Sequence, residues 1–240
     1  MEIAGLIVIV LVASILQTST GFGFSIIAAP FLLLIFEPAE AIQINLILSL
    51  VISIVLIRKI SKDIDVGVLK RLIAGSLAGL PIGIVIFLFI DIEKLKLIVS
   101  LIILVLTVML IFRFKISQNK RRDLGAGGLS GVLTISMGMP GPPLLLYFSG
   151  TAVLKAKLRG TTLAFYLFIY FMSLLIQTVF TGTNKITWIS SGLALPLVFI
   201  GLFLGQILFK RIDQNTFRIV IYCLLIFTGI YLFVDSLILN

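Results

Sequence analysis

Two short clusters of glycine, proline and hydroxyl residues interrupt the most apolar parts of the chain, at positions 18–25 (TSTGFGFS) and 137–143 (MGMPGPP). Proline removes a backbone donor and clashes with the preceding turn, so no continuous helix can cross the second cluster. Each cluster precedes a short apolar arm, 26–36 or 144–150, that can form a helix. The first turn of such an arm offers unpaired N–H groups and a partial positive charge. It can therefore bind a small anion without any charged side chain.

We predict that both clusters line one binding site. Glycines let an anion approach the backbone, and hydroxyl groups add donors. Asn45 and Thr161 follow the two short arms at comparable positions. The expected substrate-binding residues are Thr18, Ser19, Gly21, Phe22, Gly23, Ser25, Asn45, Ser136, Met137, Gly138, Gly141 and Thr161. The alternative is that the breaks are structural kinks and that Asn45 and Thr161 make hydrogen bonds between helices. Two breaks in matched positions favour the site, because paired interrupted segments are typical of transporters.

The remaining polar residues give no sign of catalysis. Histidine is absent, and all ten acidic residues lie at the ends of apolar segments or between them. We therefore expect no catalytic residue, no metal site, no cofactor and no enzymatic activity. Arg159 is interpreted as a charge that sets topology, and Gln177 as a residue that makes a hydrogen bond between helices. The opposing hypothesis is a membrane-embedded enzyme or partner protein whose helix breaks carry no transport.

The composition places these clusters inside a lipid membrane. Of the 240 residues 60% are apolar and 12% are charged, and the mean hydropathy is +1.26. A soluble domain of this size cannot bury so much apolar surface, so the expected fold class is an all-α polytopic membrane protein. The net charge of +9 does not indicate a nucleic-acid partner, because the basic residues form short clusters between apolar segments. The expected partners are the lipid bilayer and a small anionic substrate, and the oligomeric state stays open.

The apolar segments divide the chain into two similar halves, 1–112 and 124–240, joined by a basic linker at 113–123. Each half opens with a broken hairpin, 3–36 or 124–150, and continues with three apolar spans. The expected spans are 41–57, 72–90, 95–112, 161–180, 186–209 and 216–239. Three residue pairs match at an offset of 122, namely Gly79 with Gly201, Gly83 with Gly205 and Asp91 with Asp213. These matches favour a duplication, and both glycine pairs form G-x-x-x-G motifs, which let helices approach closely.

The basic residues predict how the two halves are oriented. Nearly all Lys and Arg residues fall in four segments, which are 58–71, 113–122, 155–159 and 210–218. Segments rich in Lys and Arg stay on the cytoplasmic side of a membrane. This rule requires the hairpin at 124–150 to enter and leave on the cytoplasmic side and the hairpin at 3–36 to do so on the outer side. We therefore predict two inverted repeats, hairpin tips that meet near the midplane, and both termini outside.

Two halves that each open with a glycine-rich hairpin ending in proline (GFGFSIIAAP and GLSGVLTISMGMPGPP), joined by a basic loop, resemble the sulfite exporter TauE/SafE family of membrane permeases. The resemblance implies a multi-pass permease, an exporter or facilitator, in a prokaryotic cell membrane. It implies a substrate such as sulfite, a sulfonate, thiosulfate or an organic acid. The positions that carry the resemblance are Gly21, Gly23, Pro30, Gly131, Gly138 and Pro143. Phe22, Phe24, Met137 and Met139 stand where the family often has consecutive glycines, which implies a narrower or more apolar site.

The lack of a carboxylate or histidine within any span predicts transport without proton coupling. A sodium site built from backbone carbonyls remains open, since it needs no special side chain. The membrane potential alone can drive a monovalent anion outward. An interior-negative potential of 100 mV contributes about 2.3 kcal/mol per charge, roughly a fifty-fold gradient. The hypothesis from the sequence is uncoupled, voltage-sensitive efflux centred on the helix starts at 25–27 and 141–144.

Overall fold

A computed structural model describes residues 2–91, 118–149 and 153–211 without gaps, together with scattered residues between 94 and 108 and between 213 and 234. The described residues form helices and connecting turns. The elements are α1 (Glu2–Thr20), α2 (Phe24–Ile35), α3 (Pro38–Ile60), the 3-10 turn η1 (Ser61–Asp63), α4 (Val66–Phe89), α6 (Lys120–Met137), α7 (Gly141–Ser149), α8 (Lys155–Thr181) and α9 (Lys185–Arg211). The predicted all-α class is confirmed. The expected spans 95–112 and 216–239 lie outside the continuously described residues.

Four of the described helices, α3, α4, α8 and α9, are long and apolar enough to cross a membrane. They match the spans expected at 41–57, 72–90, 161–180 and 186–209, but each extends further at one or both ends. The helices continue into the charged flanks because long basic side chains can lie along an apolar surface and still reach water. Side chains also cap these extensions, as where the Asp65 carboxylate accepts the Val68 N–H at 3.1 Å and begins α4.

Both helix breaks are shorter than the sequence predicted. The helix α1 continues through Thr20 and α2 begins at Phe24, so only residues 21–23 are not helical, and in the second hairpin only residues 138–140 are not helical. Hydroxyl residues do not end these helices, because their side chains bond to carbonyls one turn back, as Thr20 Oγ1 does to the Leu16 oxygen at 2.7 Å. Glycine ends them instead. Gly138, with φ of 71°, donates its N–H to the Thr134 carbonyl at 2.7 Å in a left-handed cap.

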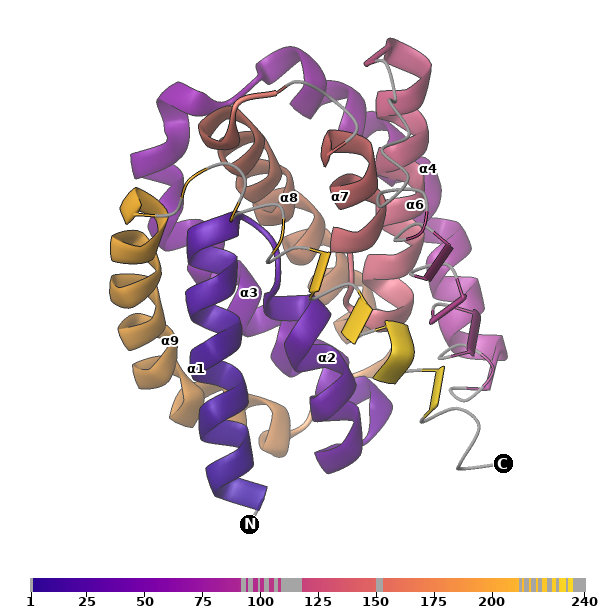
Figure 1. Ribbon diagram of the computed structural model, residues 1–240. Coiled ribbons are helices and arrows are strands. Elements are labelled where there is room, and N and C mark those ends of the chain that lie inside the picture. The colour runs from indigo at the N-terminus through magenta and orange to yellow at the C-terminus, as the bar shows by residue number, and fades with distance from the viewer. Residues whose placement is uncertain are drawn as a thin grey trace.

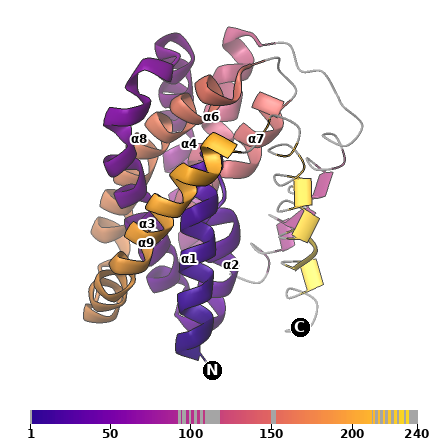
Figure 2. The ribbon, with the colours of Figure 1, turned by 60° about the vertical axis from the view of Figure 1, so that its left-hand side comes forward.

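The two hairpins approach the middle of the molecule from opposite ends (Figure 1). Hairpin 1 (α1 and α2) begins and ends at the lower end of that view, and hairpin 2 (α6 and α7) at the upper end. The second arms, α2 and α7, therefore begin near the centre and run away from each other. Figure 2 shows that α1 lies between α9 and α2, and both helices contact it.

The G-x-x-x-G motifs are sites of close helix packing, as predicted. The α4 motif packs on α6, and the α9 motif packs on α1. A Cβ atom added at Gly83 would lie 2.6 Å from the Val132 carbonyl oxygen, and one at Gly205 would lie 2.7 Å from the Ile15 carbonyl oxygen. Only glycine allows these backbones to come so near. Each motif thus holds the first arm of the hairpin that belongs to the other half of the chain.

Polar contacts gather the basic segments at one end of the molecule, here called the basic end. Lys157 in α8 pairs with Asp65 before α4 at 3.0 Å, and Lys59 in α3 donates to Gln206 in α9 at 2.7 Å. At the opposite end, Gln43 in α3 donates to the carbonyl oxygen of Gly182, which follows α8, at 2.8 Å. Because successive helices run in opposite directions, basic segments that are far apart in the sequence lie together at the basic end.

Candidate functional site

The starts of α2 and α7 meet in the interior of the protein. Ile26, in the first turn of α2, lies against Gly141, the first residue of α7. A Cβ atom added at Gly141 would stand 3.0 Å from Ile26 Cδ1. Both positions are buried. A side chain at Gly141 would therefore crowd the end of the Ile26 side chain.

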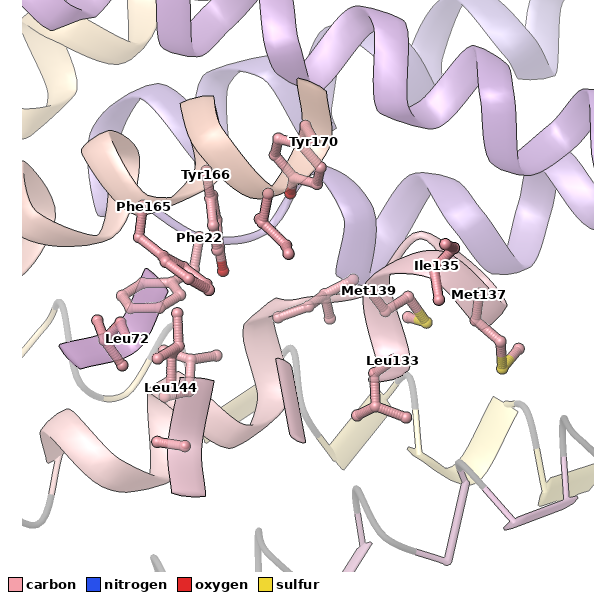
Figure 3. Close-up of a cluster of buried hydrophobic side chains, with 14 of the residues drawn as sticks. Phe22, Leu72, Leu133, Ile135, Met137, Met139, Leu144, Phe165, Tyr166 and Tyr170 are labelled. Carbon is pink, nitrogen blue, oxygen red and sulfur yellow. The ribbon is translucent and has the colours of Figure 1, made fainter. Parts of the chain in front are cut away.

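Two tyrosines of α8 fill the space beside this meeting point. The Tyr166 ring lies edge-on to Phe22 in the first break, with ring centroids 6.0 Å apart, and its centroid is 5.0 Å from that of Tyr170. The Tyr166 oxygen lies 3.2 Å from the place that a Cβ atom would take at Gly141. Figure 3 shows both hydroxyls pointing to the side where Met139 and Leu144 lie. The same part of the molecule thus holds two helix starts, two phenol groups and an apolar wall.

The two tyrosine hydroxyls differ in their partners. Tyr170 donates to Ser25 Oγ at 3.3 Å. Tyr166 is fully buried, and its hydroxyl has no hydrogen-bond partner among the residues that the structure describes. Most buried polar groups in proteins have a partner, so an unpaired one at a helix start indicates a place for a ligand atom. Neither tyrosine was predicted from the sequence to be a site residue. Two phenols spaced one helical turn apart within an apolar span were the available signal.

The two helix starts also differ in the donors that they can offer. Gly23 precedes α2 and accepts the first intrahelical bond from Ile27 at 3.0 Å, so the N–H groups of Phe24 and Ser25 have no acceptor within the helix. In α7 the second and third residues are Pro142 and Pro143, which lack an N–H group. The expectation of several donors at both ends is therefore wrong for α7. Proline in the first turn suits helix formation but removes the groups that would bind an anion.

Pro30, one of the positions that carry the family resemblance, does not lie in a first helical turn. It lies inside α2, at the seventh position of a helix that begins at Phe24. Pro30 is buried, and an interrupted helix ladder is tolerated in a membrane where protein buries it.

Asn45 is bonded to the second break, whereas Thr161 is bonded to the residue that precedes α4. Asn45 Nδ2 donates to the Gly138 carbonyl at 2.8 Å, and Asn45 Oδ1 is buried without a partner among the described residues. Thr161 Oγ1 accepts the Asp65 N–H at 2.9 Å near the basic end. Of these two expected site residues, Asn45 is the one whose hydrogen bond reaches a helix break. Thr162, next along α8, has a buried hydroxyl that lacks a partner within the described part of the chain.

The other predicted site residues surround the breaks without all facing the helix starts. Ser19 and Ser136 donate to carbonyls of their own helices, at Leu16 (3.2 Å) and Val132 (2.8 Å), so these hydroxyls are already used. Thr18 packs against α9, and Met137 is buried at the end of α6. Around the tyrosines lie Phe22, Ser25 and Gly141. Gly138 and Asn45 lie at the second break, and Gly21 and Gly23 lie at the first.

Arg159, interpreted from the sequence as a charge that sets topology, is a buried cation beside the first break. Its Nε donates to the Thr18 carbonyl at 2.7 Å, and its guanidinium lies 4.1 Å from the centre of the Phe209 ring. A Cβ atom at Gly21 would stand 3.0 Å from the Arg159 Cα atom. A cation at this place is favourable because the last turn of α1 carries unpaired carbonyls and a partial negative charge.

A second buried charge ties hairpin 2 to the first half of the chain. Asp123, assigned from sequence to the basic linker, lies in α6 and is fully buried. It accepts hydrogen bonds from Arg71 Nε in α4 and from the Tyr147 hydroxyl in α7. The interhelical bond predicted for Gln177 is present, since its Nε2 donates to the Ile135 carbonyl at 2.7 Å. Within the described residues, no group of His, Cys, Asp and Glu could hold a metal ion.

A protein-family model described as "Sulfite exporter TauE/SafE" matches residues 6–232 of the chain. No curated protein and no solved structure shows significant similarity to this chain.

Proposed function

Since the chain belongs to the sulfite exporter TauE/SafE family, a family of membrane transporters and not of enzymes, we propose that it carries a small anion that binds between the starts of α2 and α7. One observation supports this position most directly. The two helix starts meet beside a phenol hydroxyl that is fully buried and has no partner among the described residues. The proposed substrates are sulfite, a sulfonate, thiosulfate or a small organic acid.

The proposed site is buried, and so are the side chains at the two breaks beside it. Phe22, Met137 and Met139 are at most 1% exposed. An anion in this position can leave only when the hairpins move relative to their surroundings. Each hairpin packs through its first arm on a helix of the other half, α1 on α9 and α6 on α4. We propose that these two units rock against each other and open the site alternately.

The exchanged packing also supports the proposed organisation of the chain. The two halves, 1–112 and 124–240, would be inverted repeats joined by the linker 113–123, because α4 holds hairpin 2 in the same manner as α9 holds hairpin 1. The basic end would face the cytoplasm of a prokaryotic cell, and both termini would lie outside. In a Cys223→Ser background, a cysteine replacing Leu154 should react only with cytoplasmic reagents. A cysteine replacing Thr183 should react only with external ones, and the reverse pattern would contradict this topology.

Counterflow into proteoliposomes tests the transport proposal. Vesicles loaded with unlabelled sulfite, methanesulfonate, thiosulfate or acetate should take up the matching labelled anion faster than protein-free vesicles. The variant Gly141→Val should abolish uptake, because its side chain would occupy the space between Ile26 and the Tyr166 hydroxyl. Gly192→Val is the matched control, since nothing lies within 4 Å of a Cβ atom there. Uptake of none of the four anions, or normal uptake by Gly141→Val, would contradict the proposal.

The driving force is proposed to be the membrane potential alone. A potassium-diffusion potential imposed at symmetric pH and sodium should raise anion efflux when the lumen is negative and lower it when the sign is reversed. About 2.3 kcal/mol per charge is available at 100 mV. Efflux that ignores voltage but stops when a pH gradient collapses would mean that protons are carried.

A further inference from the structure

The hydroxyl of Tyr166 differs from those of the other buried tyrosines in the described part of the chain. Tyr147 donates to Asp123 and Tyr170 donates to Ser25, whereas the Tyr166 hydroxyl has no partner there. Tyr166 is completely buried. A buried hydroxyl without a partner carries a desolvation cost that a bound acceptor would remove. The group is therefore prepared to donate to something that arrives from outside the fold.

The α2 side of this hydroxyl offers more hydrogen-bond donors than the α7 side. On the α2 side lie the Phe24 and Ser25 N–H groups at the helix start and the Ser25 hydroxyl, which is in contact with Tyr170. On the α7 side, Pro142 and Pro143 remove two of the first three N–H groups. An anion at the meeting point would find donors on one side and mainly carbon on the other.

A charged side chain does not balance this asymmetry. Arg159, the nearest cation along α8, precedes Tyr166 by two helical turns, about 10 Å along the axis. Its Nε is already bonded to the Thr18 carbonyl and its guanidinium is stacked on Phe209. Recognition at the helix starts would therefore depend on neutral donors, and on where those donors point.

We infer that Tyr166 donates a hydrogen bond to the transported anion, which binds off-centre against the start of α2 with its oxygen atoms on that side and its remaining part against Pro142, Pro143 and Met139. This inference rests on the proposed transport function and adds a substrate class to it. The site would accept anions whose oxygen atoms lie on one side, such as sulfite, methanesulfonate or acetate. It would reject sulfate, because one of its four oxygens would face the side without donors and lose its hydrogen bonds.

The test is the variant Tyr166→Phe, which removes only the hydroxyl. Counterflow should show KM for sulfite raised about 10- to 100-fold, the range expected for one hydrogen bond to a charged group. The maximal rate should change far less. Thr178→Val is the matched control, because that hydroxyl bonds to the Leu174 carbonyl of its own helix at 2.8 Å. The unfolding temperature of Tyr166→Phe without anion should equal or exceed that of the wild type, while stabilisation by added sulfite should be lost.

A second variant tests the asymmetry. Pro142→Ala restores an N–H group at the start of α7, so sulfate should become a better competitor of sulfite uptake than it is for the wild type. An unchanged KM in Tyr166→Phe, or a fall in its unfolding temperature without anion, would overturn the inference, since the hydroxyl would then be idle or already paired within the fold. A wild-type protein that transports none of these anions would instead overturn the transport proposal itself.

Discussion

Replacement of Gly138 by alanine tests how the second break is held. Gly138 has a φ of 71° and lies in the left-handed region, which costs a residue with a side chain about 1–2 kcal/mol. The new Cβ atom would also lie 2.6 Å from Asn45 Nδ2. Asn45 would have to move and give up its 2.8 Å bond to the Gly138 carbonyl, leaving a buried amide unpaired at a cost of about 1–3 kcal/mol. We expect Gly138→Ala to lower the free energy of unfolding by about 2–5 kcal/mol.

A double-mutant cycle separates the two contributions. In an Asn45→Ala background the same glycine replacement should cost only the backbone strain, so the coupling between the two sites should be about 1–3 kcal/mol. Unfolding by SDS in mixed micelles, followed by circular dichroism, gives the four free energies. A coupling energy below about 0.5 kcal/mol would refute the claim that Asn45 holds the break.

Two further outcomes concern charges near the basic end. Asp123→Ala should lower the free energy of unfolding by about 1–3 kcal/mol because Arg71 loses its buried partner, and Arg71→Met in the same chain should recover part of the loss. The Val68 N–H, followed by the Lys157 ammonium, lowers the pKa of Asp65 below its ordinary value of 3.8. The charged Asp65 therefore stabilises the fold above pH 3.8, and this stabilisation disappears as pH falls through the lower folded-state pKa. Asp65→Asn should flatten the acid side of the stability curve, and an unchanged curve would contradict the assignment.

Local signals in the sequence were sufficient for the helices and their breaks. Hydropathy indicated the four described membrane helices, and glycine with proline indicated both interruptions. The predicted breaks were too long because they included hydroxyl residues such as Thr20. The side chains of these residues bond to carbonyls of the same helix, so the helix continues through them. The spacing of the G-x-x-x-G motifs was also enough to predict close helix contacts.

The residues that were missed depend on which face of a helix turns inward. Tyr166, Tyr170 and Arg159 share the inner face of α8, but the low amphipathicity of a buried membrane helix does not reveal that face. Asp123 was missed for a related reason. Its burial needs Arg71, which lies more than fifty positions earlier in the chain and is brought near by the packing of α4 on α6. Such pairings follow from tertiary structure and leave no local trace.

The most direct test of the account is to locate a bound anion in crystals. Selenite is the heavier analogue of sulfite, and its selenium atom can be located by anomalous scattering. Crystals of the full chain would be grown at selenite concentrations that inhibit sulfite counterflow. The account predicts one selenium peak at the start of α2, within hydrogen-bond distance of the Tyr166 hydroxyl and beside Ser25 and Gly141. A peak only at the basic end next to Arg159, or the absence of a peak beside Tyr166, would contradict it.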